Sequence, residues 1–208
     1  MSMRWIILSL VGIVLAVLLL KGCARKIAVP SGTIVFLGDS ITAGYGLSPE
    51  QAYPALIDIK GMTTLNLGIS GSKTADGLQR LKDYFAGGGN PQLVVIALGA
   101  NDILQGAPPE AIKANLADAL AECKNHSVPV MLCGIRIPMK FGTDEIFASV
   151  ARQGHVPLLP DLMQGEESQE NLLQEDHMHP TAEGQKIIAE KMQAALLRSF
   201  SFGATGQK

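Results

Sequence analysis

Short apolar runs alternate with longer stretches of helical periodicity between residues 33 and 197, and this alternation constrains the fold most. Apolar runs with no polar face are typical of strands that are buried on both sides. Stretches whose apolar residues recur every three or four positions predict helices. The predicted strands are 33–37, 63–67, 93–98, 128–135 and 156–159, and the predicted helices are 52–60, 75–85, 108–124, 144–153 and a last helix from Pro180.

This order of elements predicts an α/β fold with a parallel sheet covered by helices on both faces. Right-handed crossovers then give a three-layer α/β/α sandwich. Five strands suffice for the flavodoxin-like order 2-1-3-4-5, which we favour over the Rossmann order. In such sheets ligands bind beyond the carboxyl ends of the strands, so the loops after the first three strands are the place to look for function.

The first 31 residues differ from the rest of the chain. They carry four positive charges and no acid, and residues 5–20 form an uncharged apolar run. A basic start, an apolar middle and small residues after it are typical of a signal peptide. The segment could be cleaved, retained as a membrane anchor, or lipidated at Cys23, although Lys21 departs from the usual lipoprotein pattern. A buried core helix is the less favoured alternative. We therefore expect residues 1–31 to be a signal peptide or a membrane anchor, 32–200 to form one domain, and 201–208 to be a flexible tail.

The remaining body has a formal charge of about −6 and no basic stripe, which disfavours a nucleic-acid partner. Cys123 and Cys133 are interpreted as free buried thiols, with a disulfide between them left open.

Residues suited to nucleophilic catalysis stand at the predicted strand ends and near the last helix. Ser40 follows the first strand and is a candidate nucleophile, although a serine there is more often a turn residue. Asp176 and His179 are three residues apart, so the aspartate can orient the histidine as a base. Alternatively, Asp176 caps the last helix. A metal site that also uses His177 is disfavoured, because no third histidine or thiolate cluster supports it.

An acyl-transfer site also needs donors for the oxyanion. The backbone N–H groups of Ser40 and Gly71 and the side-chain amide of Asn101 all follow predicted strands and can supply them. Taken singly, Gly71 and Asn101 have ordinary turn and cap interpretations. Their conjunction with Ser40, Asp176 and His179 carries the prediction.

Four segments together resemble the GDSL-type serine hydrolases of the SGNH superfamily: Gly38-Asp-Ser-Ile-Thr42, Asn66-Leu-Gly-Ile-Ser-Gly71, Gly99-Ala-Asn-Asp102 and Asp176-His-Met-His-Pro180. Further segments at 43–46, 53–56, 135–138 and 157–160 are similar to a bacterial subgroup of thioesterases, lysophospholipases and arylesterases. The resemblance implies Ser40 as nucleophile, His179 as base, Asp176 as orienting residue, and an oxyanion hole of Ser40, Gly71 and Asn101. Thr42 rules out the G-x-S-x-G elbow of α/β-hydrolases.

The expected function is therefore hydrolysis of carboxylic esters or thioesters of small acyl substrates (aryl esters, lysophospholipids, acyl-CoA) through an acyl-enzyme, without a metal or other cofactor. Two alternatives stay open: a cell-envelope carbohydrate acetylesterase or acyltransferase with the same triad, and a non-catalytic, membrane-tethered binding module. Membrane association would use residues 5–20 or a lipidated Cys23. Five residues are candidates for an acyl site: Ile103, Leu104, Ile135, Ile137 and Pro138.

Overall fold

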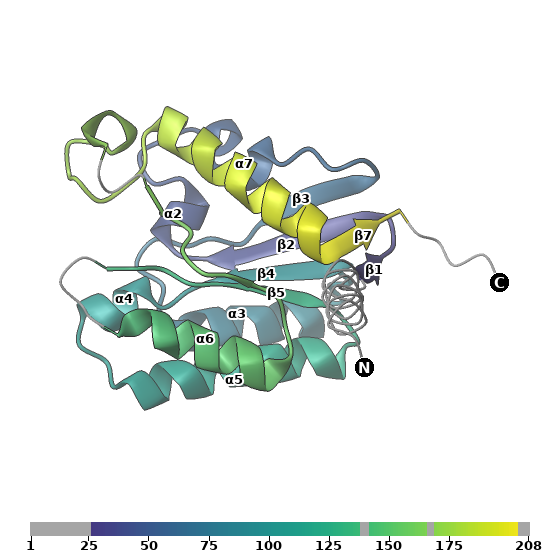
Figure 1. Cartoon of the computed structure of the whole chain (residues 1–208). Coiled ribbons are helices and arrows are strands. Elements are labelled where there is room, and N and C mark those ends of the chain that lie inside the picture. Colours follow the sequence, from purple (N-terminus) through teal and green to yellow (C-terminus); the bar gives the residue numbers. More distant parts are fainter. Residues whose placement is uncertain (1–25, 138–141, 166–168, 204–208) are drawn as a thin grey trace, which may run out of the picture.

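A computed structural model describes residues 26–137, 142–165 and 169–203, and its centre is a five-stranded parallel sheet (Figure 1). The order of the strands, β3-β2-β4-β5-β6, confirms the predicted 2-1-3-4-5 arrangement. In chain order the strands are β2 (Gly32–Gly38), β3 (Met62–Asn66), β4 (Leu93–Ala97), β5 (Val130–Cys133) and β6 (Leu158–Leu159).

Helices cover both faces of this sheet (Figure 1). The helix α7 (Ala182–Ser199) packs on one face, and α3 (Thr74–Ala86), α5 (Pro109–Asn125) and α6 (Thr143–Gly154) pack on the other. Because successive side chains of a strand point to opposite faces, each strand contributes to two separate apolar cores. Phe36 of β2 packs in the core under α7, and its neighbour Leu37 packs in the core under α3 and α5.

The two cysteines of the body lie in different cores. Cys133 of β5 belongs to the core under α7, whereas Cys123 of α5 belongs to the opposite one. Both thiols are free and buried. Burial raises the pKa of Cys123 to about 12, so this thiol stays protonated and unreactive at neutral pH.

The segment 52–60 departs from its predicted structure. Instead of one helix it contains the short 3₁₀ helix η2 (Tyr53–Leu56), and another 3₁₀ helix, η1 (Pro49–Gln51), precedes it. Ala52, between them, is extended with ψ 138°. Pro54 lacks an N–H, and the N–H of Asp58 donates to Gln193 of α7 instead of to a preceding carbonyl. Tertiary contacts with α7 therefore override the helical spacing.

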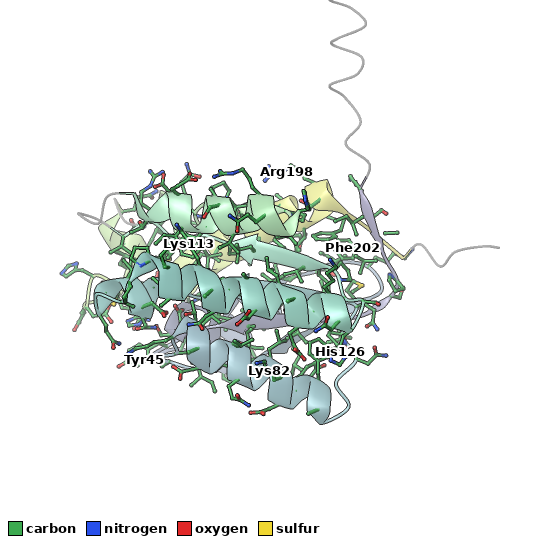
Figure 2. All side chains as sticks on the ribbon, turned by 90° about the horizontal axis from the view of Figure 1, so that it is seen from below. Tyr45, Lys82, Lys113, His126, Arg198 and Phe202 are labelled. Carbon is green, nitrogen blue, oxygen red and sulfur yellow. The ribbon has the colours of Figure 1, made fainter. Side chains whose placement is uncertain are left out.

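A second, small sheet lies at the end of the molecule opposite Tyr45 (Figure 2). In it β1 (Ile27–Val29) pairs in parallel with β7 (Phe200–Phe202). The strand β1 thus lies before the predicted boundary at residue 31 and β7 spans the one at residue 201, and Val29 and Phe200 are buried in the core under α7. Residues 1–25, 138–141, 166–168 and 204–208, which include Cys23 and Pro138, lie outside the described residues.

In the described residues three further short helices occur in loops: α2 (Ser40–Ala43) after β2, α4 (Ala100–Leu104) after β4, and η3 (Glu170–Leu172) before the last helix. The first two begin immediately beyond the carboxyl ends of adjacent central strands. They therefore bring Ser40 and Asn101 to the same edge of the sheet. No helix in the described part of the chain is long and apolar enough to span a membrane.

Candidate active site

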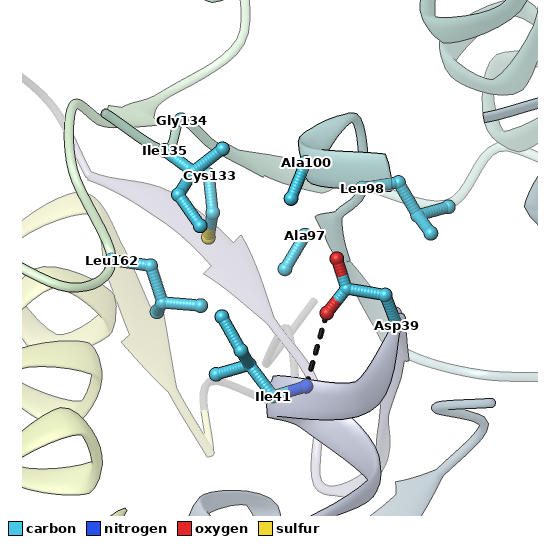
Figure 3. Close-up of a pocket in the computed structure, with 9 residues that line it drawn as sticks. All are labelled: Asp39, Ile41, Ala97, Leu98, Ala100, Cys133, Gly134, Ile135 and Leu162. Carbon is cyan, nitrogen blue, oxygen red and sulfur yellow. Dashed lines mark hydrogen bonds between the residues drawn. The ribbon is translucent and has the colours of Figure 1, made fainter. Parts of the chain in front are cut away.

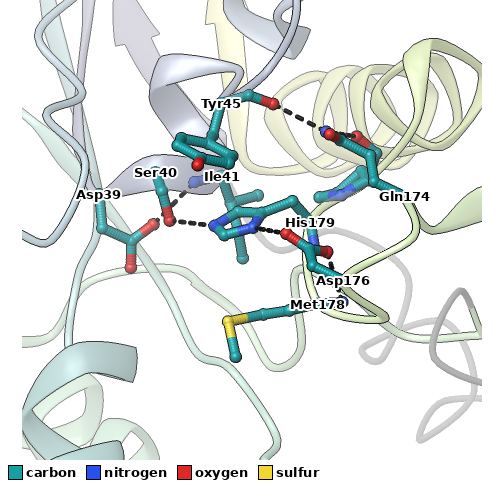
Figure 4. A network of polar contacts seen from close by, with 9 residues as sticks. Asp39, Ser40, Ile41, Tyr45, Gln174, Asp176, Met178 and His179 are labelled. Atoms are coloured by element: carbon teal, nitrogen blue, oxygen red, sulfur yellow. Dashed lines mark hydrogen bonds and ion pairs between the residues drawn. The ribbon is translucent and has the colours of Figure 1, made fainter.

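Three side chains from two distant parts of the sequence form a continuous series of hydrogen bonds (Figure 4). The Oγ of Ser40 lies 2.9 Å from Nε2 of His179. On the other side of the same ring, Nδ1 lies 2.6 Å from Oδ2 of Asp176. A hydroxyl, an imidazole and a carboxylate in this order can move the hydroxyl proton to the ring while the carboxylate stabilises the imidazolium.

The carboxylate of Asp176 is fixed by the backbone that follows it. Its Oδ1 accepts hydrogen bonds from the N–H groups of Met178 and His179, each at 2.9 Å. The bonds from the His179 backbone and ring, helped by the Met178 N–H, lower the pKa of Asp176 to about 2. The ionised Oδ2 then holds the proton of the imidazole on Nδ1, which leaves Nε2 as the acceptor for Ser40.

Tyr45 and Gln174 hold the histidine in place from the other side (Figure 4). The Tyr45 ring lies over the imidazole, with 4.4 Å between ring centroids. The amide of Gln174 donates to the carbonyl oxygens of Tyr45 (2.7 Å) and Pro180 (2.9 Å). Tyr45 belongs to a segment quoted above for its resemblance, but Gln174 carried no signal in the sequence.

The loop of Ser40 is held against the last helix. The buried amide of Gln185 on α7 accepts from the Tyr53 N–H (2.8 Å) and donates to the Ile41 carbonyl (2.9 Å). The Thr42 hydroxyl lies 3.0 Å from that of Tyr53. The helix α2 and its first residue, Ser40, are therefore fixed to the sandwich by buried polar contacts.

Asp39, a residue that is only 4% exposed, caps α2 with its carboxyl group. Its Oδ1 accepts a hydrogen bond from the Ile41 N–H at 3.1 Å. Asp39 also borders a cavity of about 10 Å³ whose walls are mainly apolar (Figure 3). Burial raises the pKa of Asp39 from 3.8 to about 6, although hydrogen bonds from the Ile41 and Asp39 backbones oppose the rise. The loop of Ser40 therefore carries a buried acid that is costly to ionise.

This cost predicts a pH-dependent gain of stability from Asp39→Asn. A carboxyl whose pKa is raised on folding stabilises the fold below pH 4 and loses that stabilisation as the pH rises through about 6. Asparagine keeps the acceptor for Ile41 and does not ionise. We expect the free energy of unfolding of the variant, relative to the wild type, to rise by about 2 kcal/mol between pH 4 and pH 8 in urea titrations. Asp118→Asn, on the exposed face of α5, is the control, and a pH-independent difference at Asp39 would contradict the assignment.

The loops that carry Gly71 and Asn101 are joined to the loop of Ser40. The Ile69 N–H donates to the Gly38 carbonyl at 3.2 Å, and the Asn101 amide donates to the Ser72 carbonyl at 3.0 Å. Gly71 adopts φ +80°, a conformation that favours glycine. These contacts bring the segments of all three predicted oxyanion donors together beyond the carboxyl ends of β2, β3 and β4.

An apolar pocket of about 220 Å³ opens beside Ser40 and His179. Of the predicted acyl-site residues, Leu104, Ile135 and Ile137 line it, together with Met163, Leu173 and Met178, which the sequence did not single out. Ile103 does not: its side chain is buried in the core under α3 and α5, because it faces the sheet one position before Leu104. Pro138 lies outside the described residues. Within those residues, no three histidine, cysteine or acidic side chains gather as metal ligands would.

Comparisons with known proteins agree with this arrangement. The model of the GDSL-like lipase/acylhydrolase family matches residues 36–187. The chain is 31% identical to an arylesterase of Vibrio mimicus over 193 residues, which cover 87% of this chain and 96% of that protein. It is 32% identical to thioesterase 1/protease 1/lysophospholipase L1 of Escherichia coli K12, with 79% of this chain and 83% of the relative covered.

Among solved structures, the psychrotrophic esterase EstA from Pseudoalteromonas superposes with a TM-score of 0.74 at 28% identity, covering 80% of this chain and 97% of EstA. The family match spans more than half of the chain, and it includes the segments of Ser40, Gly71, Asn101, Asp176 and His179. The chain therefore belongs to the GDSL-like lipase/acylhydrolase family and is a serine ester hydrolase.

Proposed function

We propose that Ser40 is the nucleophile of this hydrolase, with His179 as its general base and Asp176 as the orienting carboxylate. Ser40 Oγ attacks the acyl carbonyl while Nε2 of His179 takes the hydroxyl proton. The imidazolium then protonates the leaving alcohol or thiol, and the acyl group stays on Ser40. Water, deprotonated by the same nitrogen, releases the acid and restores the serine.

The oxyanion of each tetrahedral intermediate is proposed to accept hydrogen bonds from the Ser40 and Gly71 N–H groups and from Asn101. The Asn101 amide has two N–H bonds, so one can donate to the oxyanion while the other donates to the Ser72 carbonyl. That contact orients the amide before substrate arrives. Such prearranged donors stabilise the developing charge without reorganisation in the transition state.

The observation that carries this proposal is the unbroken Ser40–His179–Asp176 chain at the mouth of an apolar pocket. Its walls suit an acyl chain, and the names of the relatives are those of an arylesterase and a thioesterase/lysophospholipase. We therefore propose aryl esters, lysophospholipids and acyl-CoA thioesters as the substrate class. A binding module would have no need of an aligned hydroxyl, imidazole and carboxylate.

The test combines a covalent probe with a substrate panel. EstA has been crystallised inhibited by monoethylphosphonate, so a fluorophosphonate is the appropriate probe for this chain. We expect one adduct, located on Ser40 by peptide mass, and hydrolysis of the aryl, lysophospholipid and acyl-CoA substrates. Absence of labelling in the folded protein would overturn the proposal. Acetate release from acetylated glycans without octanoyl-ester hydrolysis would instead favour the acetylesterase alternative.

Leu104 offers a test of the acyl site. Its side chain is 44% exposed at the pocket wall, so replacing it disturbs little of the core. We expect Leu104→Ser to lower kcat/KM for p-nitrophenyl octanoate by about 5- to 20-fold, because a buried acyl chain loses about 1–2 kcal/mol of apolar contact. The acetate ester, too short to reach this wall, should be hydrolysed at an unchanged rate.

The matched control is Leu197→Ser on α7, since Leu197 is also 44% exposed but is outside the pocket. Equal losses with both esters, or an equal loss in the control, would show that Leu104 does not contact the acyl chain.

We also propose that residues 1–31 export the enzyme or tether it to a membrane. The support is their charge pattern and the uncharged apolar run at residues 5–20, which ends before the first strand of the described structure, β1, begins at Ile27. Cell fractionation with mass analysis of the mature N-terminus distinguishes the forms. A cleaved chain, an intact anchor and a lipidated Cys23 each give a different mass, and an intact chain in the soluble cytoplasmic fraction would contradict the proposal.

A further inference from the structure

Arg80 of α3 lies behind the three loops of the site. Its Nη2 donates to the Gly38 carbonyl at 2.9 Å, two residues before Ser40. Its Nη1 donates to the Ser72 hydroxyl at 3.1 Å, one residue after Gly71. One planar guanidinium thus bridges the nucleophile loop and the loop of the predicted oxyanion glycine.

Both residues that Arg80 contacts, Gly38 and Ser72, make a second contact within the site. The Gly38 carbonyl also accepts the Ile69 N–H at 3.2 Å. The backbone carbonyl of Ser72 accepts from the Asn101 side chain at 3.0 Å. The contacts therefore run from Gly38 through Arg80 and Ser72 to Asn101, and they join the segments of all three proposed donors.

Burying the Arg80 guanidinium between these loops costs the folded protein stability. Burial lowers the pKa of Arg80, partly offset by the charges of Asp76 and Asp39. Within the described part of the chain, the buried Nε of Arg80 has no hydrogen-bond partner. A partly desolvated cation with an unsatisfied donor is weak evidence for a stabilising role and calls for another explanation.

We propose that Arg80 is a positioning residue that holds the Gly71 N–H and the Asn101 amide in register with Ser40 Oγ. The proposal rests on the function proposed above, because it assigns those groups to the oxyanion hole. Arg80 contacts neither substrate nor the reacting atoms. It acts through Gly38 and Ser72, whose positions determine those of their neighbours.

If Arg80 positions the oxyanion donors, its replacement should lower kcat and leave KM nearly unchanged. The oxyanion exists only along the reaction path, so displaced donors raise the barrier without weakening substrate binding. Loss of one whole donor costs on the order of 10²–10³ in kcat, and displacement by a fraction of an ångström to 1 Å costs about 10–10². Lysine keeps the charge but cannot reach two acceptors with the guanidinium's fixed fork.

The experiment uses the full chain with Arg80→Lys, Arg80→Met, Ser72→Ala and the double variant Arg80→Met/Ser72→Ala. The control is Arg152→Lys, at an exposed ion pair with Glu145 on α6. Readouts are kcat and KM for p-nitrophenyl butyrate, the inhibition constant of a phenylboronic acid, which forms a tetrahedral adduct on serine, and the thermal midpoint.

We expect Arg80→Lys to lower kcat by about 10- to 100-fold with KM within twofold of the wild type. The boronate inhibition constant should rise in step with the fall in kcat/KM. Ser72→Ala should lower kcat several-fold alone and hardly at all in the Arg80→Met background, because the two side chains act through one contact. Arg152→Lys should behave as the wild type.

Three results would overturn the positioning role. They are an unchanged kcat in Arg80→Lys, a loss of kcat without a change in boronate affinity, and additive losses in the double variant. If Arg80→Met does not fold, Arg80→Lys and Ser72→Ala still decide the question. Failure of the function itself is separate, because wild-type activity that survives in Ser40→Ala would show that Ser40 is not the nucleophile.

Discussion

We expect Ser40→Ala to lower kcat for a short p-nitrophenyl ester by about 10⁴-fold or more, because no acyl-enzyme can form. The His179 ring, which lies 2.9 Å from Ser40 Oγ, loses the hydroxyl that we propose it deprotonates. Residual hydrolysis from the oxyanion donors alone would require water to take the place of the serine. A mutant that retains substrate affinity but gives no burst of nitrophenol in the first turnover fits this expectation.

The fold should tolerate this change well. Ser40 is the first residue of a short helix, and its cap is supplied by Asp39, which the substitution leaves in place. The matched control is Ser149→Ala on α6, whose hydroxyl donates to a carbonyl of its own helix. We expect full activity in the control and similar thermal midpoints in all three proteins. Near-normal turnover by Ser40→Ala would refute its assignment as the nucleophile.

The sheet could be predicted from the sequence because its signal is local. Each central strand is a run of residues with no polar face, and the run at residues 93–98 contains β4 (Leu93–Ala97), in which every residue is buried. The strand order followed from the count of strands and the handedness of crossovers. The predicted helix at 52–60 failed because its environment is not local: the N–H of Asp58 is bonded to Gln193 of α7.

The same distinction applies to the site. Ser40, Asn101 and His179 could be predicted because each stands in a short motif beyond a strand or before a helix. Arg80 and Gln174 could not, because each acts on carbonyl groups of residues distant in the sequence. A helical arginine near other polar residues predicts only an exposed face. The partners of Arg80 lie in the loops after β2 and β3, which only the folded structure brings side by side.

Asp39 and Arg80 also show where stability is given up near the site. Both are ionisable groups that are partly or almost fully buried beside the loop of Ser40. Burial raises the pKa of Asp39 and lowers that of Arg80, so it favours the neutral form of each. Asp39 holds the start of α2, and Arg80 joins that loop to Ser72. Apolar replacements would suit the surrounding cores but would leave the backbone groups at these loops without partners. We therefore expect these loops to contribute less to the free energy of unfolding than the apolar cores of the sandwich.

We expect Asp176→Asn to lower kcat at neutral pH on the order of 10⁴-fold, with little change in folding. The backbone N–H groups of Met178 and His179 both donate to Oδ1, so the carbonyl oxygen of asparagine would take that position. Its NH₂ group would then face Nδ1 of the imidazole, where the Oδ2 acceptor now lies. A donor there favours the tautomer with its proton on Nε2, which cannot accept the proton of Ser40.

Glu175→Gln is the matched control, because it removes one negative charge from the adjacent, exposed residue. We expect its kcat to stay within twofold of the wild type. This comparison separates the effect of Asp176 on the tautomer of His179 from the effect of one negative charge near the site. The rate of fluorophosphonate labelling should fall in Asp176→Asn alongside kcat, since both reactions need a deprotonated Ser40. If Asp176→Asn and Glu175→Gln lost activity equally, the carboxylate would act only through its charge, and its orientation of His179 would be excluded.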